Sequence, residues 1–233
     1  MNLSKLEWDS DFFGFPVYKL EIDSVCDLDL PSIAGGLQGG ICYVIISSAI
    51  ASSCTSWLEG IGAKYYGSRV MYKAMTEEQD GSGDNEAITI SNLSDDVYQL
   101  AINSGKCSRF AKDLKFAPKF EALYRKWIEN CFIAKSKVRG EIFGIYNNNE
   151  LVGLEALSKS GDNAKIELLS VAEAHQRKGI GRKLVHAAFV YAMKNNCRSL
   201  TVITQGQNES ACNLYQSCGF KEVERKVIWH LPL

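Results

Sequence analysis

Residues 174–183 read AHQRKGIGRK, and they combine two glycines with four Arg or Lys side chains in a chain whose net charge is only -1. The segment follows a strand-like run at residues 165–171 and precedes a helix expected over residues 181–195. A helix N-terminus exposes unpaired backbone N–H groups and carries partial positive charge, and glycine lets an anion approach the backbone closely. The segment therefore predicts a phosphate-binding turn between a strand and a helix.

The sequence of this turn excludes two common phosphate-binding loops. It lacks the G-x-x-x-x-G-K-[ST] pattern of nucleoside-triphosphate P-loops, and it lacks the G-x-G-x-x-G pattern of dinucleotide-binding folds. It also follows strands expected to be antiparallel, whereas the dinucleotide pattern opens a parallel strand–helix–strand unit. A basic turn ahead of a surface helix is the alternative interpretation of the same residues.

The sequence around the turn predicts a mixed α/β sheet. Two strand-like runs flank Asn-Asn-Asn-Glu at residues 147–150, which predicts a hairpin. A second turn at residues 160–163 leads to the strand before the glycine segment. The expected strands are residues 87–90, 141–146, 151–158, 165–171, 200–204 and 225–231, and the expected helices are residues 95–103, 119–132, 181–195 and 210–217.

One break in composition divides the chain. Residues 76–85 read TEEQDGSGDN, which is acidic, contains two glycines and has no apolar side chain, as linkers and long loops do. We therefore expect a small N-terminal α/β domain over residues 1–80 and a larger domain over residues 86–233. Because about 75 residues enclose only a limited core, we expect the small domain to pack against the rest of the chain.

The overall composition argues against several classes of function. The chain has 26 basic and 27 acidic side chains, so it lacks the excess of positive charge that is typical of nucleic-acid-binding proteins. Eight cysteines without a C-x-x-C pair, together with only three histidines, predict reduced thiols and no metal site. The N-terminal residues lack the pattern of a signal peptide, and no apolar run is long enough to span a membrane. We therefore expect a cytoplasmic protein.

The glycine segment and the residues after it resemble one known superfamily. Q-R-K-G-I-G at residues 176–181 is similar to the acyl-CoA signature R/Q-x-x-G-x-G/A of the GNAT acetyltransferases. The resemblance covers residues 86–231 and implies a GNAT-type fold, which is a mixed, mostly antiparallel sheet flanked by helices. It also implies an N-acetyltransferase that uses acetyl-CoA as cosubstrate and no metal. Further along, the features that follow in that superfamily's order are the strand at residues 200–204, Asn208, Leu214-Tyr215 and Gly219-Phe220.

The same resemblance implies which residues hold acetyl-CoA. Backbone amides of the glycine segment would bind the pyrophosphate. Main-chain groups at the end of the strand before it, together with one asparagine after the next strand, would hold the pantetheine arm. The implied cofactor-binding residues are Leu169, Val171, Gln176, Arg177, Lys178, Gly179, Ile180, Gly181, Arg182 and Asn208.

Transfer of an acetyl group from a thioester to an amine needs a proton donor for the leaving thiolate. Tyr215 follows Asn208 on a short expected helix, where the GNAT superfamily places a tyrosine near the CoA sulfur. A phenol is neutral at pH 7 and has a pKa close to that of a thiol, so it is suited to this role. Tyr215 is therefore the expected catalytic acid, and core packing beside Phe220 is the alternative.

The base that accepts the amine proton is less sharply indicated. Side chains alternate along a strand, so Glu167 is expected on the same face as Leu169 and Val171, which line the acyl site. Glu167 is therefore the candidate base, acting directly or through water, and a solubilising role at the strand edge is the alternative. Glu155 on the neighbouring strand is a second candidate, and ordered water alone is a third. The expected oxyanion donor is a backbone N–H near Val171.

Other segments resemble the TDP-fucosamine acetyltransferases, which also carry a small domain ahead of the acetyltransferase domain. This resemblance implies a nucleotide-activated amino sugar as acceptor, such as dTDP-4-amino-4,6-dideoxygalactose, in surface polysaccharide synthesis. Arg109 would contact its diphosphate or sugar through a planar guanidinium. Phe13 is a candidate apolar surface for the nucleotide, and a place in the N-terminal core is its more ordinary role. The resembling segments are residues 6–9, 12–14, 108–110, 123–130 and 204–215.

Two alternatives to this function stay open. The first is a GNAT acetyltransferase for another acceptor, such as a polyamine, an aminoglycoside or a protein N-terminus. The second is a non-catalytic CoA-binding protein that keeps the fold. The closing strand at residues 227–231 is a candidate for pairing across a homodimer.

Overall fold

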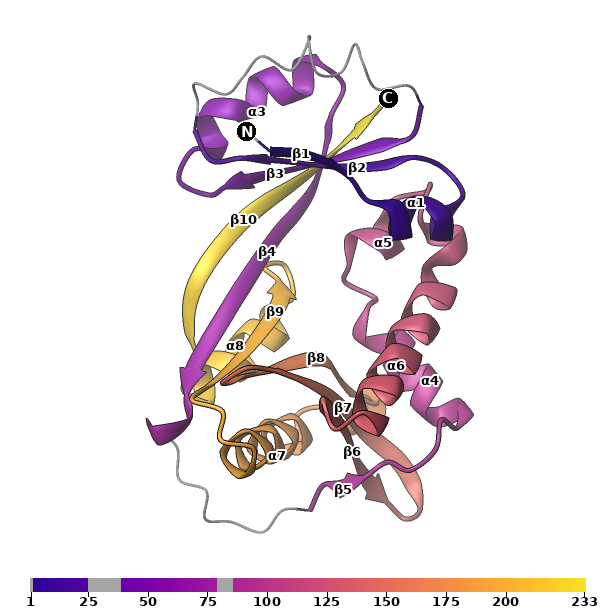
Figure 1. Ribbon diagram of the computed structural model, residues 1–233, viewed down its shortest axis with the longest axis vertical. Helices are drawn as coiled ribbons and strands as arrows, with labels where there is room; N and C mark the ends of the chain where they lie inside the picture. The colour runs from indigo at the N-terminus through magenta and orange to yellow at the C-terminus, as the bar shows by residue number, and fades with distance from the viewer. Residues whose placement is uncertain (1, 25–38, 79–85) are drawn as a thin grey trace. The chain divides into compact units, whose positions relative to one another are not determined.

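The structure, a computed structural model, describes residues 2–24, 39–78 and 86–233 (Figure 1). The chain folds into two compact units, and neither is a single continuous stretch of sequence. Unit 1 comprises Met1–Val70, Gln205–Gln207 and Glu224–Leu233. Unit 2 comprises Met71–Thr204 and Asn208–Val223.

The division between the units differs from the boundary expected at residues 76–85. It falls inside the strand β4 (Lys64–Met75), and the end of the chain belongs to unit 1. The physical reason is strand pairing, because the last part of β10 (Lys221–Pro232) pairs antiparallel with β3 (Ile41–Ser47). Of the expected linker, residues 76–78 form a short 3-10 helix, η2 (Thr76–Glu78), and residues 79–85 lie outside the described residues.

Unit 1 contains a sheet built around β3, whose sequence ICYVIIS is buried along almost its whole length. On one side of β3 lies β2 (Val17–Ile22), which is parallel to it, and β1 (Asn2–Lys5) pairs antiparallel with β2. On its other side lies β10. The described strands of unit 1 thus lie in the order β1-β2-β3-β10.

Two helices lie among the described residues of unit 1. The helix α3 (Ala51–Gly60) buries Cys54 and Leu58 in one core cluster with Leu20 and Val44 of the strands. The helix α1 (Glu7–Phe13) ends at Gly14, whose positive φ of 83° places it in the left-handed region that favours glycine at a helix end.

The strands of unit 2 follow the order β4-β9-β8-β7-β6-β5 in the sheet. Neighbours from β5 to β8 are antiparallel, and β8 and β9 are parallel. This confirms the mixed, mostly antiparallel sheet expected from the sequence. The strands are β5 (Ile88–Thr89), β6 (Gly140–Asn147), β7 (Glu150–Ser160), β8 (Asn163–Val171) and β9 (Ser199–Gln205), with the parts of β4 and β10 that belong to this unit.

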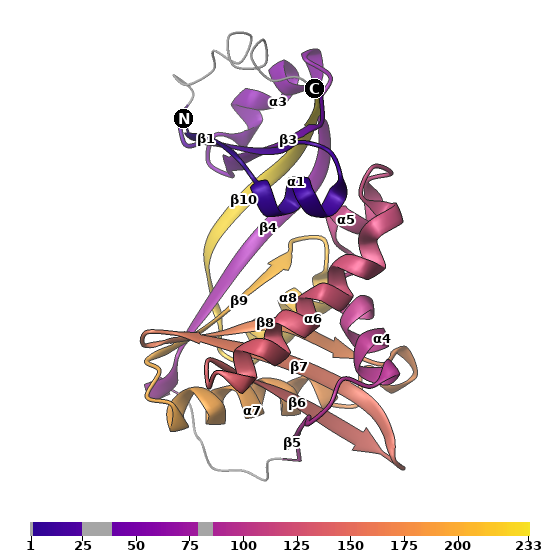
Figure 2. The same ribbon diagram turned by 45° about the vertical axis from the view of Figure 1, so that its right-hand side comes forward.

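Helices cover both faces of the unit 2 sheet (Figures 1 and 2). On one face, α4 and α6 pack against each other and against the strands, and on the other face α7 packs against β6, β7 and β8. None of the helices in the described parts of the chain is long and apolar enough to cross a membrane. The helices are α4 (Asp95–Ser104), α5 (Arg109–Lys112), α6 (Phe120–Ser136), α7 (Ile180–Lys194) and α8 (Glu209–Ser217), with the 3-10 turns η3 (Ala117–Lys119) and η4 (Glu173–His175).

The hairpin between β6 and β7 forms where the sequence predicts it. Asn147 pairs with Glu150, so only two residues turn the chain. These residues, Asn148 and Asn149, have positive φ values of 50° and 67°. Two consecutive left-handed residues match the twist of a two-residue hairpin, and asparagine tolerates this conformation better than most residues.

Candidate active site

The phosphate-binding turn expected from the sequence begins the helix α7. Ile180 is its first residue, and Gly179 is its N-cap, with a φ of 84°. No side chain caps this helix start, so its first backbone N–H groups stay available to an anion. A residue with a Cβ would be strained at the φ of Gly179, so the backbone conformation at this position favours glycine.

Gly181 has a different role from Gly179. A Cβ built on Gly181 would lie 3.0 Å from a methyl group of Leu214 in α8. The second glycine of the motif therefore permits α7 and α8 to pack closely. Both glycines stay predicted to let the anion approach the backbone. Gly179 in addition adopts a left-handed conformation, and Gly181 in addition lies close to Leu214.

The four cations of the turn fall into two groups. Arg182 donates hydrogen bonds to the carbonyl and hydroxyl oxygens of Ser217, both at 3.3 Å, and Lys183 forms an ion pair with Glu86 at 2.7 Å. Arg177 and Lys178 are exposed, and neither has a hydrogen-bond or ion-pair partner among the described residues. These two side chains are therefore the cations free to meet an anion at the helix start.

The strand that leads into the turn parts from its parallel neighbour. The pairing of β8 with β9 runs from Asn163 and Ser199 to Ile166 and Val202, while β8 continues to Val171. The residues of β8 after Ile166 are therefore not paired with β9. The side-chain amide of Gln176 donates a hydrogen bond to the Val171 carbonyl at 3.2 Å, which links the turn to the end of the strand.

A β-bulge in β8 corrects the expected position of Glu167. Leu157 pairs with Ile166 and Ala156 pairs with Leu168, so Glu167 is the extra residue. A single extra residue reverses the alternation of side chains beyond it, so Glu167 does not share a face with Leu169. The prediction that these residues line one face is therefore wrong.

The contacts on each side of the bulge show the two faces directly. Leu169 and Val171 pack in a cluster with Ile180 and Leu184, on the face that α7 covers. Glu167 instead faces α6, where its charge raises the pKa of Cys131 in addition to the larger effect of burial.

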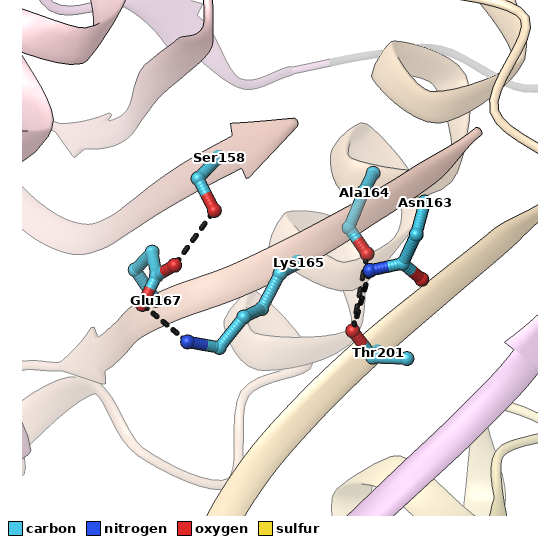
Figure 3. A network of polar contacts seen from close by, with 6 residues as sticks. All are labelled: Ser158, Asn163, Ala164, Lys165, Glu167 and Thr201. Atoms are coloured by element: carbon cyan, nitrogen blue, oxygen red, sulfur yellow. Dashed lines mark hydrogen bonds and ion pairs between the residues drawn. The ribbon is translucent and has the colours of Figure 1, made fainter. Parts of the chain in front are cut away.

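Glu167 is also held by two polar neighbours, which Figure 3 shows. The Ser158 hydroxyl donates to one carboxylate oxygen at 2.6 Å, and Lys165 forms an ion pair with the other at 2.8 Å. Next to this group, the Thr201 hydroxyl donates to the Ala164 carbonyl and accepts from the Asn163 amide, which joins β8 to β9 (Figure 3). Glu167 is thus part of a polar network, and two of its hydrogen-bond acceptor sites are engaged.

Tyr215 lies in the core of unit 2, with an exposed fraction of 4%. Its ring is 5.6 Å from that of Phe220 and 6.1 Å from that of Tyr72. Burial raises the pKa of this phenol most, and the nearby charges of Glu155 and two cysteines raise it further. Tyr215 is therefore neutral at physiological pH, as an acid needs to be, and it also packs against Phe220 as its alternative role requires.

Asn208, the residue expected to reach the pantetheine arm, caps the helix that carries Tyr215. Its side-chain oxygen accepts the Ala211 backbone N–H at 3.2 Å. An N-cap leaves the amide nitrogen of the same side chain free to donate. The structure therefore gives Asn208 a structural role that is compatible with a contact to the cofactor.

Glu155 is the second candidate base from the sequence, and its environment in the structure is unusual for a carboxyl group. It has an exposed fraction of 0%, and neither carboxyl oxygen has a hydrogen-bond partner among the described residues. Burial raises its pKa well above the usual value of 4.5. The signal in the sequence is a single acidic residue inside the apolar run LVGLEAL.

The two candidate acceptor-binding residues differ in exposure. Phe13 in unit 1 is 5% exposed and its ring packs beside Phe12 and Phe15, so it occupies a core position. Arg109 in unit 2 is half-buried at the start of α5, and its guanidinium lies over the Phe110 ring, 4.3 Å from the centroid. Of the two, only Arg109 offers a charged group to a ligand.

The described residues contain no group of three His, Cys, Asp or Glu side chains arranged to hold a metal ion. The seven cysteines in the same part of the chain are all free thiols.

Comparison with known proteins relates part of this chain to one family. Residues 106–220, which run from just before α5 through α8 to Phe220, match the family described as Acetyltransferase (GNAT) family. A streptothricin acetyltransferase from Escherichia coli is 37% identical over 79 residues, which are 34% of this chain and 45% of that protein. A mycothiol acetyltransferase from Corynebacterium efficiens is 28% identical over 90 residues, which are 38% of this chain and 30% of that protein. The chain thus spans less than half the length of either relative.

Solved structures share the fold at low sequence identity. A GCN5-related N-acetyltransferase from Sphaerobacter thermophilus has a TM-score of 0.63 at 9% identity, and the match covers 98% of this chain and 75% of that one. A GCN5-related N-acetyltransferase from Kribbella flavida has a TM-score of 0.57 at 11% identity, over 99% of this chain and 87% of that one. Together with the family match over residues 106–220, these likenesses show that the chain has the GNAT fold.

Proposed function

We propose that this chain is an N-acetyltransferase that transfers the acetyl group of acetyl-CoA to the amine of a small acceptor. The observation that carries the proposal is the start of α7. There Gly179 adopts a left-handed conformation, no side chain caps the helix, and the exposed cations Arg177 and Lys178 have no partner among the described residues. A pyrophosphate matches this combination, because backbone N–H groups and two cations would share its negative charge.

The end of β8 supports a place for the pantetheine arm. Its residues beyond Ile166 are not paired with β9, so main-chain groups of Leu169 and Val171 are candidates to bind an extended, amide-containing ligand. The amide nitrogen of Asn208 is a further candidate donor. An arm bound here would bring its thioester toward Tyr215 in α8.

Tyr215 supports the chemistry of the transfer. When the acceptor amine has attacked the thioester carbonyl, the departing thiolate needs a proton, and a neutral phenol can donate it. The nitrogen loses its proton to water in the same turnover. Glu167 is not required as the base in this scheme, because Lys165 and Ser158 already engage its carboxylate.

The binding part of the proposal is tested by calorimetry with acetyl-CoA. Replacing Arg177 and Lys178 together by Ala should weaken binding about tenfold or more, because two charge-assisted contacts to phosphate are lost. Lys194→Ala, at the far end of α7, is the matched control and should bind normally. Normal affinity in the double variant would place the cofactor elsewhere.

The acceptor in this proposal is a nucleotide-activated amino sugar, with dTDP-4-amino-4,6-dideoxygalactose as the first choice. The support is Arg109, whose half-buried guanidinium is suited to a diphosphate, and the segment resemblance that includes it. Other small amines are the competing acceptors, since the curated relatives are named for streptothricin and mycothiol.

A panel of acceptors separates these alternatives. CoA release should be fastest with dTDP- or UDP-linked 4-amino or 3-amino sugars and far slower with the free amino sugar, because the remote diphosphate helps to position the amine. Arg109→Ala should raise KM for the nucleotide sugar and leave acetyl-CoA binding unchanged. Arg125→Ala is a matched control, because Arg125 also stacks on an aromatic ring, that of Tyr98 at 4.7 Å. Faster turnover of streptothricin or of the free sugar would refute the nucleotide-sugar acceptor alone.

A further inference from the structure

A buried carboxyl that the proposed reaction does not yet use is Glu155 of β7. Its exposed fraction is 0%, and both of its oxygens are without a hydrogen-bond partner among the described residues. Leaving a buried polar group without a partner is unfavourable, so a group of this kind calls for a physical explanation. Proteins retain such groups chiefly where the group has a task in the site.

The register of the sheet shows which way Glu155 points. Its partners across the two neighbouring strands are Phe143 of β6 and Leu169 of β8. Both partners pack in the cluster with Ile180 and Leu184, and side chains directly opposite each other in a sheet share a face. Glu155 therefore projects to the α7 face, the same face as the end of β8 where the pantetheine arm is proposed.

Tyr215 is a titratable group whose pKa is affected by a charge on Glu155. A charge on Glu155 raises the pKa of Tyr215, in second place after burial, and Cys212 and Cys218 of α8 add smaller effects in the same direction. The residues that face Glu155 from β6 and β8 are apolar, so no cation from those strands stabilises its carboxylate. Burial accordingly raises the pKa of Glu155 itself and favours its neutral, protonated form.

The chemistry of the leaving group gives the neutral form a use. When Tyr215 protonates the CoA sulfur, a phenolate forms in an apolar core, where an unpaired charge is unfavourable. A protonated carboxyl nearby can donate a hydrogen bond to that phenolate, whereas a carboxylate would repel it. Hydrogen bonds of this kind are often long in the free enzyme and shorten only in the reacting complex.

We propose that Glu155 is a positioning residue that acts through Tyr215, as an uncharged acid that donates a hydrogen bond to the phenolate oxygen while the CoA thiolate is protonated. In this step the Tyr215 O–H bond breaks and an S–H bond forms on CoA. Water returns a proton to the phenolate, and the acceptor nitrogen releases one to water, so the two transfers cancel and turnover of a neutral amine releases no net proton. The inference rests on the proposed function, because it needs a thiolate that leaves beside Tyr215.

Two variants of Glu155 separate this role from packing and from proton donation. Glu155→Gln keeps a neutral hydrogen-bond donor of the same shape, so its kcat should stay within about threefold of the wild-type value. Glu155→Leu fills a similar volume without a donor, so its kcat should fall about tenfold or more. Acetyl-CoA affinity, measured by calorimetry, should hold in both. The same substitutions at Glu150, the exposed first residue of β7, are the matched controls and should leave kcat unchanged.

A double-mutant cycle with Tyr215→Phe tests whether Glu155 acts through the phenol. On the Tyr215→Phe background, Glu155→Leu should cause no further loss of kcat, because no phenolate forms there. Wild-type kcat in Glu155→Leu, a loss as large in Glu155→Gln, or multiplicative losses in the double variant would each overturn the inference. These measurements use the best acceptor found in the panel.

Infrared spectroscopy supplies a measurement that needs no acceptor. The wild-type protein at pH 8 should show the carbonyl stretch of a protonated carboxyl group, and Glu155→Gln should lack it. Absence of that band in the wild type would also overturn the inference. A failure of the proposed function is distinguishable, because it would appear as absent acetyl-CoA binding or as normal turnover in Tyr215→Phe.

Discussion

On the α4–α6 face of the unit 2 sheet, Glu167 accepts a hydrogen bond from Ser158 and pairs with Lys165. On the α7 face, Glu155 has no polar partner among the described residues and is completely buried. The two glutamates lie on neighbouring strands and differ in one respect above all, namely whether the fold supplies partners to the charged form. The comparison shows that a carboxyl group suited to carry charge and one suited to stay neutral can lie on opposite faces of one strand pair.

The comparison extends to the α7 face as a whole, where the proposed anion-binding turn lies. Gly179→Asp should abolish measurable acetyl-CoA binding, with a loss of affinity of about 100-fold or more, because a side chain is strained at a φ of 84° and a carboxylate repels pyrophosphate. Calorimetry on the folded variant measures this. Gly161→Asp, at another glycine with positive φ, in the turn between β7 and β8, is the control for backbone strain alone. Normal affinity in Gly179→Asp would remove the anion site from this face.

The second largest effect is expected from Tyr215→Phe. The change keeps the ring that packs against Phe220 and removes only the ionisable hydroxyl, so kcat should fall about 100-fold while acetyl-CoA affinity holds. Steady-state release of CoA, followed with a thiol reagent, gives kcat. Tyr191→Phe, a tyrosine of α7, is a suitable control. A wild-type rate would make Tyr215 a packing residue and would remove the functional difference between the two faces.

Glu155 should also reveal itself in the pH dependence of stability. Its pKa is raised in the folded state above the usual 4.5, so the folded state binds its proton more tightly than the unfolded state does. The contribution of Glu155 to the free energy of unfolding should therefore be largest below about pH 4.5. It should decline as the pH rises toward the pKa of Glu155 in the folded state, by up to about 1.4 kcal/mol per pH unit.

Glu155→Gln should lack this decline, and its stability relative to wild type should therefore increase between pH 5 and pH 8. Urea unfolding at several pH values measures the difference, with Glu150→Gln as the control that should follow the wild type. Parallel curves for the wild type and Glu155→Gln would mean that the carboxyl is charged in the folded state.

The smallest effect is expected on the other face. Glu167→Gln removes the charge that pairs with Lys165, so the free energy of unfolding should fall by about 1 kcal/mol. Its kcat should fall less than about threefold, whereas removal of an obligate base would cost about 100-fold or more. Equilibrium unfolding and kcat measured on the same preparation decide between the two. A large loss of kcat with normal stability would restore Glu167 as the base.

Local features of this fold were predictable from the sequence where local chemistry determines them. The two asparagines of the β6–β7 turn and the glycine before α7 each require a particular backbone conformation, and both turns form where expected. The bulge at Glu167 was not predictable, because it depends on how β7 and β8 pair and leaves the alternation of sequence along β8 intact. The side chain of Glu167 was therefore assigned to the wrong face.

The same limit applies to the candidate site. The anion turn and Tyr215 follow from motifs in consecutive residues, so sequence reasoning could propose them. The apolar surroundings of Glu155 depend on Phe143 and Leu169, which neighbouring strands bring beside it. Its effect on the pKa of Tyr215 likewise depends on a helix far along the chain. The engagement of Gly181 with Leu214 likewise requires two helices to be in place. Long-range neighbours of this kind have no local signature.

The pairing of β3 with β10 has a consequence for synthesis on the ribosome. The sheet of unit 1 needs residues 226–232, and these emerge only after every residue of unit 2 has been made. During translation, β3 therefore remains an apolar strand with one edge open, which favours contact with chaperones and with other nascent chains. Unit 2 ends at Val223, within the first residues of β10, so all of its residues are made before unit 1 is complete and it is positioned to fold first. The N-terminal part of this protein is then the last to reach its native state.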